Sequence, residues 1–268
     1  MILFRRILTS AVLIALIVSV IFRGGTFLFS LFVFLFTAVA LFEFFTLLRE
    51  AKMPCYRLFG AVMGSIIPVV VYLEHGSTRS GEVLFLVLGC ICLFVLQFSH
   101  KNNAEALVGI SLTLFGILYV SWFLSFLIKL RFLEDGARWA AYLLATTKAA
   151  DVGAYVVGSL FGKHPLMAHI SPKKSVEGMF GGWTASVAVS VALKPFLPLP
   201  WSLTHLLLLG LFIGVLGQIG DLSESLMKRF CQTKDSGAIL PGMGGVMDAV
   251  DSVLFTAPLF YFHLRTFF

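Results

Sequence analysis

The chain has 268 residues, of which 59% are hydrophobic and only 13% are charged, and its mean hydropathy is +0.96. This composition excludes a soluble globular domain, because a chain of this length cannot bury so much apolar surface, and it indicates an integral membrane protein. The formal net charge of +6 is not a nucleic-acid footprint, and we expect no nucleic acid among the partners.

Apolar runs recur along the chain, and most approach the ~20 residues that a helix needs to cross a bilayer. The runs are continuous and do not alternate, which disfavours a β-barrel. We therefore predict an all-α integral membrane protein, a polytopic bundle of about nine transmembrane helices. The predicted spans are Ile7–Phe22, Thr26–Leu48, Leu58–Leu73, Val83–Phe98, Ala106–Leu127, Trp139–Phe161, Gly178–Leu193, Leu203–Gly220 and Gly245–Arg265.

The basic residues predict how these spans are oriented. Arg5 and Arg6 precede the first run as in a signal peptide, but no small-residue cleavage site follows, so we expect a retained first helix. With a cytoplasmic N-terminus, 12 Lys and Arg residues fall on the inner face and 7 on the outer face. This bias favours a multi-pass protein of the cell inner (cytoplasmic) membrane, with its N-terminus inside and its C-terminus outside.

The chain changes character near residue 140. The first half is aromatic and aliphatic, and Glu43 is its main buried exception. We predict that residues 1–138 form transmembrane scaffold helices and that residues 139–268 form a catalytic transmembrane region. Two basic, hydrophilic segments interrupt this second region, at Gly162–Glu177 and Lys228–Gly244. Both fall on the cytoplasmic side, and we expect them to be loops that cover a site at the inner membrane surface.

Asp248 and Asp251 are the first candidate site residues. Their i, i+3 spacing places both carboxylates on one face of a helix, after the turn formed by Pro241–Gly245. Two adjacent carboxylates raise each other's pKa unless a cation lies between them, and such pairs with substrate phosphates suit Mg²⁺. The alternative is a pair of solvated residues favoured by the dipole at a helix start.

Asp221 and Glu224 repeat this spacing at the end of the eighth predicted span. Ser225 and Lys228 extend the same face, and a carboxylate, a hydroxyl and a lysine on one stripe suit a metal–phosphate site. For Glu224 a simple surface pair with Lys228 is equally compatible with the sequence. That alternative fits Asp221 less well, because Asp221 follows a long stretch without formal charge.

The basic residues of the two hydrophilic segments are candidate phosphate ligands, since lysine and arginine neutralise phosphates. The alternative is ordinary positive-inside charge. Gly181–Gly182 follows the earlier segment, and exposed backbone amides at such glycine turns can also hold an anion. The candidates are Lys173, Lys174, Lys228, Arg229 and Lys234, and Asp235 follows the last of them.

Asp151 lies in the sixth predicted span, three residues after Lys148. A structural ion pair and a contact with substrate are both compatible with this spacing.

Together these residues resemble the phosphatidate cytidylyltransferases, or CDP-diacylglycerol synthases. The resemblance spans about residues 140–260 and includes many fixed positions. The late part is carried by Ser225, Lys228, Arg229, Lys234, Asp235, Pro241, Gly242, Gly244, Gly245, Asp248 and Asp251. The earlier part is carried by Asp151, Gly153, Ala154, Tyr155, Gly158, Phe161–Lys163, Ile170–Lys174, Glu177–Gly178 and Gly181–Gly182. Two positions depart from the family: Met243 replaces a common His, and Ala249 replaces a common Arg.

The resemblance implies the reaction of CTP with phosphatidic acid to give CDP-diacylglycerol and pyrophosphate, in phospholipid biosynthesis. It implies Mg²⁺ as cofactor, held by Asp221, Asp248 and Asp251, and leaves a second cation open. It also implies that Asp221, Lys228, Asp248 and Asp251 are catalytic. The implied substrate-binding residues are Asp151, Lys173, Lys174, Ser225, Arg229, Lys234, Asp235, Gly244 and Gly245.

The implied partners are CTP, phosphatidic acid and membrane lipids, and a homodimer is left open. Two alternatives from other classes remain at this stage. One is a CTP-dependent polyisoprenoid kinase or a related lipid cytidylyltransferase, which would share the nucleotide and the membrane site. The other is a cation-coupled transporter, which predicts carboxylates spread along a transmembrane path.

Overall fold

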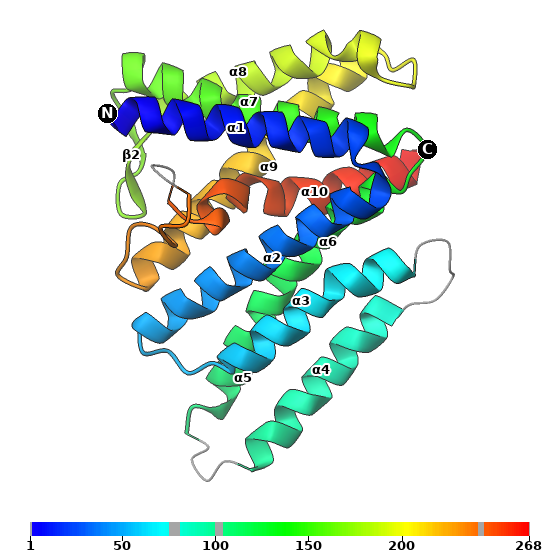
Figure 1. Cartoon of the computed structure of the whole chain (residues 1–268). Coiled ribbons are helices and arrows are strands. Elements are labelled where there is room, and N and C mark those ends of the chain that lie inside the picture. The colour runs from blue at the N-terminus through cyan, green and yellow to red at the C-terminus, as the bar shows by residue number, and fades with distance from the viewer. Residues whose placement is uncertain (1, 75–80, 100–103, 241–243, 268) are drawn as a thin grey trace. The chain divides into compact units, whose positions relative to one another are not determined.

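The computed structural model describes residues 2–74, 81–99, 104–240 and 244–267, without the side chains of residues 2–8 and 10 (Figure 1). It divides into two compact units, Met1–Phe132 with Cys231–Met247 and Leu133–Phe230 with Asp248–Phe268. The first division lies close to the predicted boundary at residue 138. Residues Cys231–Met247, however, belong with the N-terminal helices. The scaffold and catalytic roles of the two regions stay predictions.

The first unit is built from helices of the first half of the chain. In Figure 1, α2, α3 and α4 run side by side as a layer of roughly antiparallel rods. A π-helical segment, η1, connects α5 and α6, so that these three segments form one continuous helix. The elements are α1 (Ile2–Arg23), α2 (Gly25–Glu50), α3 (Arg57–Leu73), α4 (Gly81–Phe98), α5 (Ala106–Gly116), η1 (Ile117–Trp122) and α6 (Phe123–Arg131).

Small residues set the packing of α3 on α2. A Cβ atom at Gly60 would collide with the ring of Phe45, and one at Gly64 would collide with the side chain of Leu41. Phe45 and Leu41 are fully buried. Membrane helices associate through such close packing, because lipid removes the hydrophobic drive that water supplies to soluble proteins.

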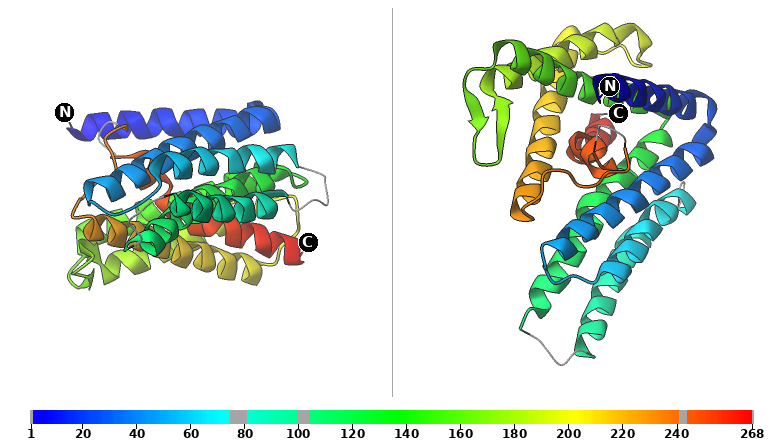
Figure 2. Two further views of the ribbon diagram at one scale, coloured as in Figure 1. Left: turned by 90° about the horizontal axis from the view of Figure 1, so that it is seen from below. Right: turned by 60° about the vertical axis from the view of Figure 1, so that its left-hand side comes forward.

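The second unit combines long helices with the one sheet found in the described residues, an antiparallel pair of strands. Figure 2 shows this hairpin projecting from the ends of the two helices that it joins, α7 and α8. The elements are α7 (Gly136–Phe161), β1 (Pro165–Met167), β2 (Ser171–Ser175), α8 (Val176–Ala192), the 3₁₀ turn η2 (Lys194–Phe196), α9 (Leu203–Phe230) and α10 (Val246–Phe267). The first two residues of α10 belong to the first unit.

The glycines after Glu177 have a different role from the predicted one. Ser175 caps α8 by accepting a hydrogen bond from the N–H of Gly178 at 3.1 Å, so the helix begins at Val176. Gly181 and Gly182 therefore lie inside α8 and not in a turn. The prediction that their amides hold an anion is wrong, because interior helical amides donate to carbonyls of the preceding turn. A Cβ at Gly181 would instead collide with Val157 of α7.

Seven of the nine predicted spans fall entirely within a helix of the structure, the fifth within the continuous helix of α5, η1 and α6. The spans predicted at Gly178–Leu193 and Gly245–Arg265 each extend one residue beyond the helix that they match, α8 and α10. Four described helices are long and apolar enough to cross a membrane, namely Gly25–Glu50, Gly81–Phe98, Ala106–Arg131 and Leu203–Phe230. These findings fit an all-α membrane protein with several spans. The number of about nine spans stays a prediction.

Candidate functional site

The predicted row of polar residues on α9, from Asp221 to Lys228, is present in the second unit, and it pairs with a carboxylate of α10. Lys228 forms ion pairs with Glu224, one turn before it, and with Asp248 on α10. Glu224 has no exposed side-chain surface, and Lys228 is only 13% exposed. The alternative of an ordinary surface pair is therefore wrong, because Glu224 is buried and shares its lysine with a second carboxylate.

Helix α10 comes close to α9 at Gly220, where a Cβ would collide with the carbonyl oxygen of Asp251. The missing side chain brings Asp251 next to the residue after Gly220, which is Asp221. Asp251 is buried, and its carboxylate interacts electrostatically with Asp221 and with Lys148 of α7. Asp248 pairs with Lys228 of α9 and Asp251 is buried, so the alternative of a solvated pair does not fit Asp251.

A third group of polar residues joins α7 to α10. The ammonium of Lys148 donates to Asp151 Oδ2 at 2.8 Å and to Ser252 Oγ at 2.9 Å. The hydroxyl of Ser252 in turn donates to Asp151 Oδ2 at 2.9 Å. The structure shows the Lys148–Asp151 ion pair, one of the two alternatives that the spacing left open. It adds Ser252, which sequence reasoning missed because 101 positions separate it from Asp151.

The first hydrophilic segment folds as a β-hairpin, with Pro165 paired to Ser175 and Met167 to Ser171. Strand β2 carries Lys173 and Lys174. Lys174 reaches α9, where its ammonium lies 2.7 Å from Asp221 Oδ2 and 3.5 Å from Ser225 Oγ. Lys173 is exposed. The expected loop is thus an ordered arm that connects basic residues to the acidic face of α9.

Further contacts fix both ends of this hairpin. The guanidinium Nε of Arg229 donates to the carbonyl of Ile170 at 3.0 Å. Glu177 accepts from the N–H groups of Lys163 and His164 at 3.0 and 3.3 Å, and its other oxygen lies 2.6 Å from His164 Nδ1. These hydrogen bonds, the one from Lys163 first, lower the pKa of Glu177 to about 2. The carboxylate of Glu177 therefore remains ionised at neutral pH and closes the base of the hairpin.

The charges of this cluster fit a divalent cation. Five carboxylates, those of Asp151, Asp221, Glu224, Asp248 and Asp251, share three lysines, Lys148, Lys174 and Lys228. When all are ionised, two negative charges remain. Hard oxygen donors are what Mg²⁺ prefers, and it is commonly held by one or two carboxylates, waters and substrate phosphates.

The structure does not gather the three expected metal ligands into one group. Within the described ranges, no three His, Cys, Asp or Glu side chains lie close enough together to hold a metal ion. Asp221 is bound to Lys174, and Asp248 to Lys228. Asp221 and Asp251 are the neighbouring pair of carboxylates. The carboxylate oxygens of this cluster are donors of the kind that Mg²⁺ prefers.

Four expected substrate-binding residues belong to the other compact unit, in the segment Cys231–Met247. Lys234 and Asp235 are exposed there. Gly244 has a φ of +97°, a conformation that glycine adopts without strain. A Cβ at Gly245 would collide with the hydroxyl of Ser236 and the carboxylate of Glu43, so a larger residue requires these side chains to shift. Met243 lies outside the described residues. Ala249 is half-buried on α10 between Asp248 and Val250.

Sequence reasoning missed the role of Glu43, in the middle of α2. Its carboxylate is 3% exposed and accepts hydrogen bonds from the backbone N–H groups of Val246 at 3.0 Å and Met247 at 2.8 Å. These are the first two residues of α10. A helix start leaves its first amides without partners, and a carboxylate is favoured there by charge as well. The sequence did contain a signal for this role, because an ionisable residue inside an apolar span usually has a function.

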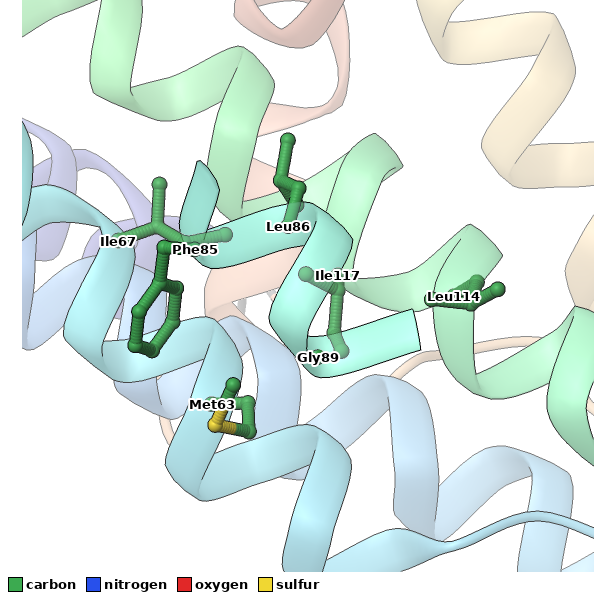
Figure 3. Close-up of a pocket in the computed structure, with 7 residues that line it drawn as sticks. All are labelled: Met63, Ile67, Phe85, Leu86, Gly89, Leu114 and Ile117. Carbon is green, nitrogen blue, oxygen red and sulfur yellow. The ribbon is translucent and has the colours of Figure 1, made fainter. Parts of the chain in front are cut away.

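The cavity shown in Figure 3 lies in the first unit and does not belong to this site. It is lined only by apolar residues of α3, α4, α5 and η1, whose side chains Figure 3 labels: Met63, Ile67, Phe85, Leu86, Gly89, Leu114 and Ile117. Such a lining offers nothing to a nucleotide or to a phosphate. The charged cluster of the second unit is therefore the candidate functional site.

Comparison with known proteins covers nearly the whole chain. The model of the cytidylyltransferase family matches residues 4–267. The chain is 34% identical to the phosphatidate cytidylyltransferase of Bacillus subtilis over 98% of both chains. It is 34% identical to that of Synechocystis sp. over 96% of this chain and 95% of the relative, and 31% identical to that of Staphylococcus epidermidis over 95% and 96%. The similarity thus extends beyond residues 140–260 into the N-terminal helices.

Proposed function

The chain belongs to the cytidylyltransferase family and is a nucleotidyltransferase, and we propose that it catalyses the reaction of CTP with phosphatidic acid to form CDP-diacylglycerol and pyrophosphate. One observation supports the charged cluster of the second unit as the site of this reaction. The acidic faces of α9 and α10 meet through Lys228, and the basic hairpin reaches the same face through Lys174. A phosphoryl-transfer site needs this combination of carboxylates and cations.

In this reaction an oxygen of the lipid phosphate attacks the α-phosphorus of CTP. The bond from that phosphorus to the oxygen bridging it to the β-phosphate breaks, and pyrophosphate leaves with the electron pair. The protein has little covalent work to do, so it acts by positioning the two phosphates and by neutralising their charge. Lys173, Lys174, Lys228 and Arg229 would supply positive charge to the triphosphate, and Ser225 a hydrogen bond.

We propose that Asp221, Asp248 and Asp251 hold Mg²⁺ together with substrate oxygens. The oxygen donors of these aspartates support this proposal. When bound, the ion would neutralise the negative charge that builds up on the phosphate oxygens during the transfer. Lys228 orients Asp248 and compensates Glu224, and Asp151 is the proposed contact to substrate near α7. A second cation remains open.

The proposed reaction also requires an orientation in the membrane. CTP is charged and does not cross a bilayer unaided, so the hairpin and the segment after α9 would face the cytoplasm. We propose nine spans in the cell inner membrane, with the N-terminus inside. Exposed apolar side chains on α4, such as Val83, Leu84 and Val87, suit contact with lipid. A homodimer is a further proposal, which light scattering of the detergent-solubilised protein would test.

Product analysis of the purified protein tests this function. With labelled CTP, phosphatidic acid and Mg²⁺, we expect a CDP-lipid and pyrophosphate in equal amounts. Formation of CDP and a phosphorylated polyisoprenoid alcohol would indicate the kinase instead. Ion uptake by proteoliposomes without nucleotide turnover would indicate the transporter. Omission of phosphatidic acid serves as the control, since no CDP-lipid should then form.

A further inference from the structure

Lys148 is a cation of the second unit that has no role in the reaction proposed so far. It lies near the middle of α7, a helix of 26 residues. Two of its three N–H donors are directed to Asp151 and Ser252. Although Ser252 is fully buried, the side chain of Lys148 is 44% exposed and that of Asp151 is 34% exposed. The protein therefore holds the ammonium through two hydrogen bonds, while part of the Lys148 side chain is exposed.

Lys148 has more carboxylate neighbours than a lysine in an ordinary surface ion pair. Asp251, Asp151 and Asp221 all interact with it electrostatically. It thus interacts with the buried carboxylate of Asp251 from α7, whereas Lys174 and Lys228 are bound to Asp221 and Asp248. A phosphate oxygen that approached Asp251 from this side would meet Lys148 as its positive partner.

The position along α7 distinguishes Lys148 from the other cations. It precedes the end of the helix at Phe161 by 13 residues, about 20 Å at a rise of ~1.5 Å per residue. Lys173 and Lys174 lie beyond that end, on the hairpin. If α7 crosses the membrane as proposed, Lys148 lies within the bilayer and the hairpin lies at its surface. A water-soluble triphosphate arrives from the hairpin side, whereas the acyl chains of a lipid substrate keep it on the bilayer side of the site.

We propose that Lys148, held by Asp151 and Ser252, binds the phosphate of phosphatidic acid, while Lys173 and Lys174 bind CTP. This inference rests on the proposed function and names the residue that recognises the lipid substrate. Ser252 is a positioning residue, and Asp151, besides its proposed contact to substrate, also fixes the direction of the ammonium. A lysine pre-oriented in this way contributes a charge-assisted hydrogen bond to the phosphate without much loss of side-chain freedom.

Binding measurements without turnover test the inference. Wild type and Lys148→Met are compared for the affinity of dioleoyl phosphatidic acid in detergent micelles, with dioleoylglycerol as the ligand that lacks the phosphate. Affinity for CTP is measured separately, with Mg²⁺ and without lipid. We expect Lys148→Met to bind phosphatidic acid about tenfold to a hundredfold more weakly. Its affinities for CTP and for dioleoylglycerol should change less than about threefold.

Three further variants separate recognition from folding. Lys148→Met leaves Asp151 without its partner, so Lys148→Met combined with Asp151→Asn removes both charges and provides a folded reference. Lys148→Arg should restore most of the preference for phosphatidic acid over dioleoylglycerol. Lys194→Met removes an exposed lysine of the same unit and should leave that preference unchanged.

The inference is overturned if Lys148→Met and the double variant keep the wild-type preference for phosphatidic acid. It is also overturned if they lose affinity for CTP and not for the lipid, since Lys148 would then belong to the nucleotide. Failure of the proposed function has a different signature. Wild type itself would then form no CDP-diacylglycerol and would not distinguish phosphatidic acid from dioleoylglycerol, and the inference would fall with it.

Discussion

The carboxylate of Glu43 on α2 accepts a hydrogen bond from the backbone N–H of Met247, 204 positions later in the chain. Its other oxygen accepts from Val246. Gly237 and Gly245 leave the space in which this carboxylate lies, because a Cβ at either residue would collide with it. The start of α10 is therefore fixed by a buried charge from a helix of the first half, and Asp248 is the next residue along α10.

Replacing Glu43 tests the importance of this contact. Glu43→Ala leaves two buried N–H groups without acceptors, each at a cost of about 1–3 kcal/mol, and we expect a clear loss of thermal stability and of turnover. Glu43→Gln keeps one acceptor oxygen and should lie between Ala and wild type. The measurement is thermal unfolding in detergent together with initial rates. Equal stability of all three proteins would show that the cap contributes nothing.

Asp248→Asn and Asp251→Asn should each reduce turnover at least a hundredfold, by roughly 3 kcal/mol or more, while the proteins still insert and purify. Each removes a charge from the cluster that we propose to hold Mg²⁺. Rates are measured across a magnesium titration. Asp135→Asn, at a half-exposed pair with Arg138 in the same unit, is the matched control and should be unaffected. Near-normal rates for both site variants would contradict the metal assignment.

The two lysines of β2 should differ in their effects. Lys173→Ala removes an exposed cation, and we expect a higher KM for CTP with little change in stability. Lys174→Ala also removes the partner of Asp221, at 2.7 Å, so kcat should fall as well. Steady-state kinetics with varied CTP at saturating lipid gives both values. If neither constant changes, these lysines are only positive-inside topology signals.

Acid should loosen the base of the hairpin. The pKa of Glu177 is lowered to about 2 from 4.5 by its hydrogen bonds to Lys163 and His164. A lowered folded-state pKa contributes stability that is fully present above the unfolded value and is lost as the pH falls towards 2. Hydrogen exchange of residues 160–177 should therefore lose protection between about pH 4.5 and 2.5. Glu177→Gln should show weaker protection that does not depend on pH, and the same acid-dependent loss in that variant would exclude Glu177 as its cause.

The proposed mechanism depends on the orientation in the membrane, which cysteine labelling in intact cells can decide. In a variant without its four native cysteines, cysteines replacing Ala168 and Ala238 should resist an impermeant reagent, and one replacing Thr266 should react. All three positions are exposed, so protection reports the membrane and not burial. Reaction at Ala238→Cys with protection at Thr266→Cys would reverse the orientation and remove entry of CTP from the cytoplasm.

Local features of this protein followed from the sequence. The positions of the helices were predictable, because a long apolar run in a membrane must satisfy its own backbone hydrogen bonds. The faces of α9 and α10 followed from helical spacing, and so did the pair of Lys148 and Asp151. The family resemblance rested on the same local patterns and was confirmed over almost the full chain.

Tertiary structure decided which of these faces meet. Lys174 and Ser225 are 51 positions apart, and Lys148 and Ser252 are 104 apart. No periodicity encodes such pairs, because they depend on how closely two helices approach. Gly220 and Gly181 allow that close approach because they lack a side chain. For Gly181 the sequence had suggested an anion-binding turn. Burial of Glu224 and capping by Glu43 likewise arise only when distant backbones pack, since a carboxylate's environment is a property of its neighbours in space.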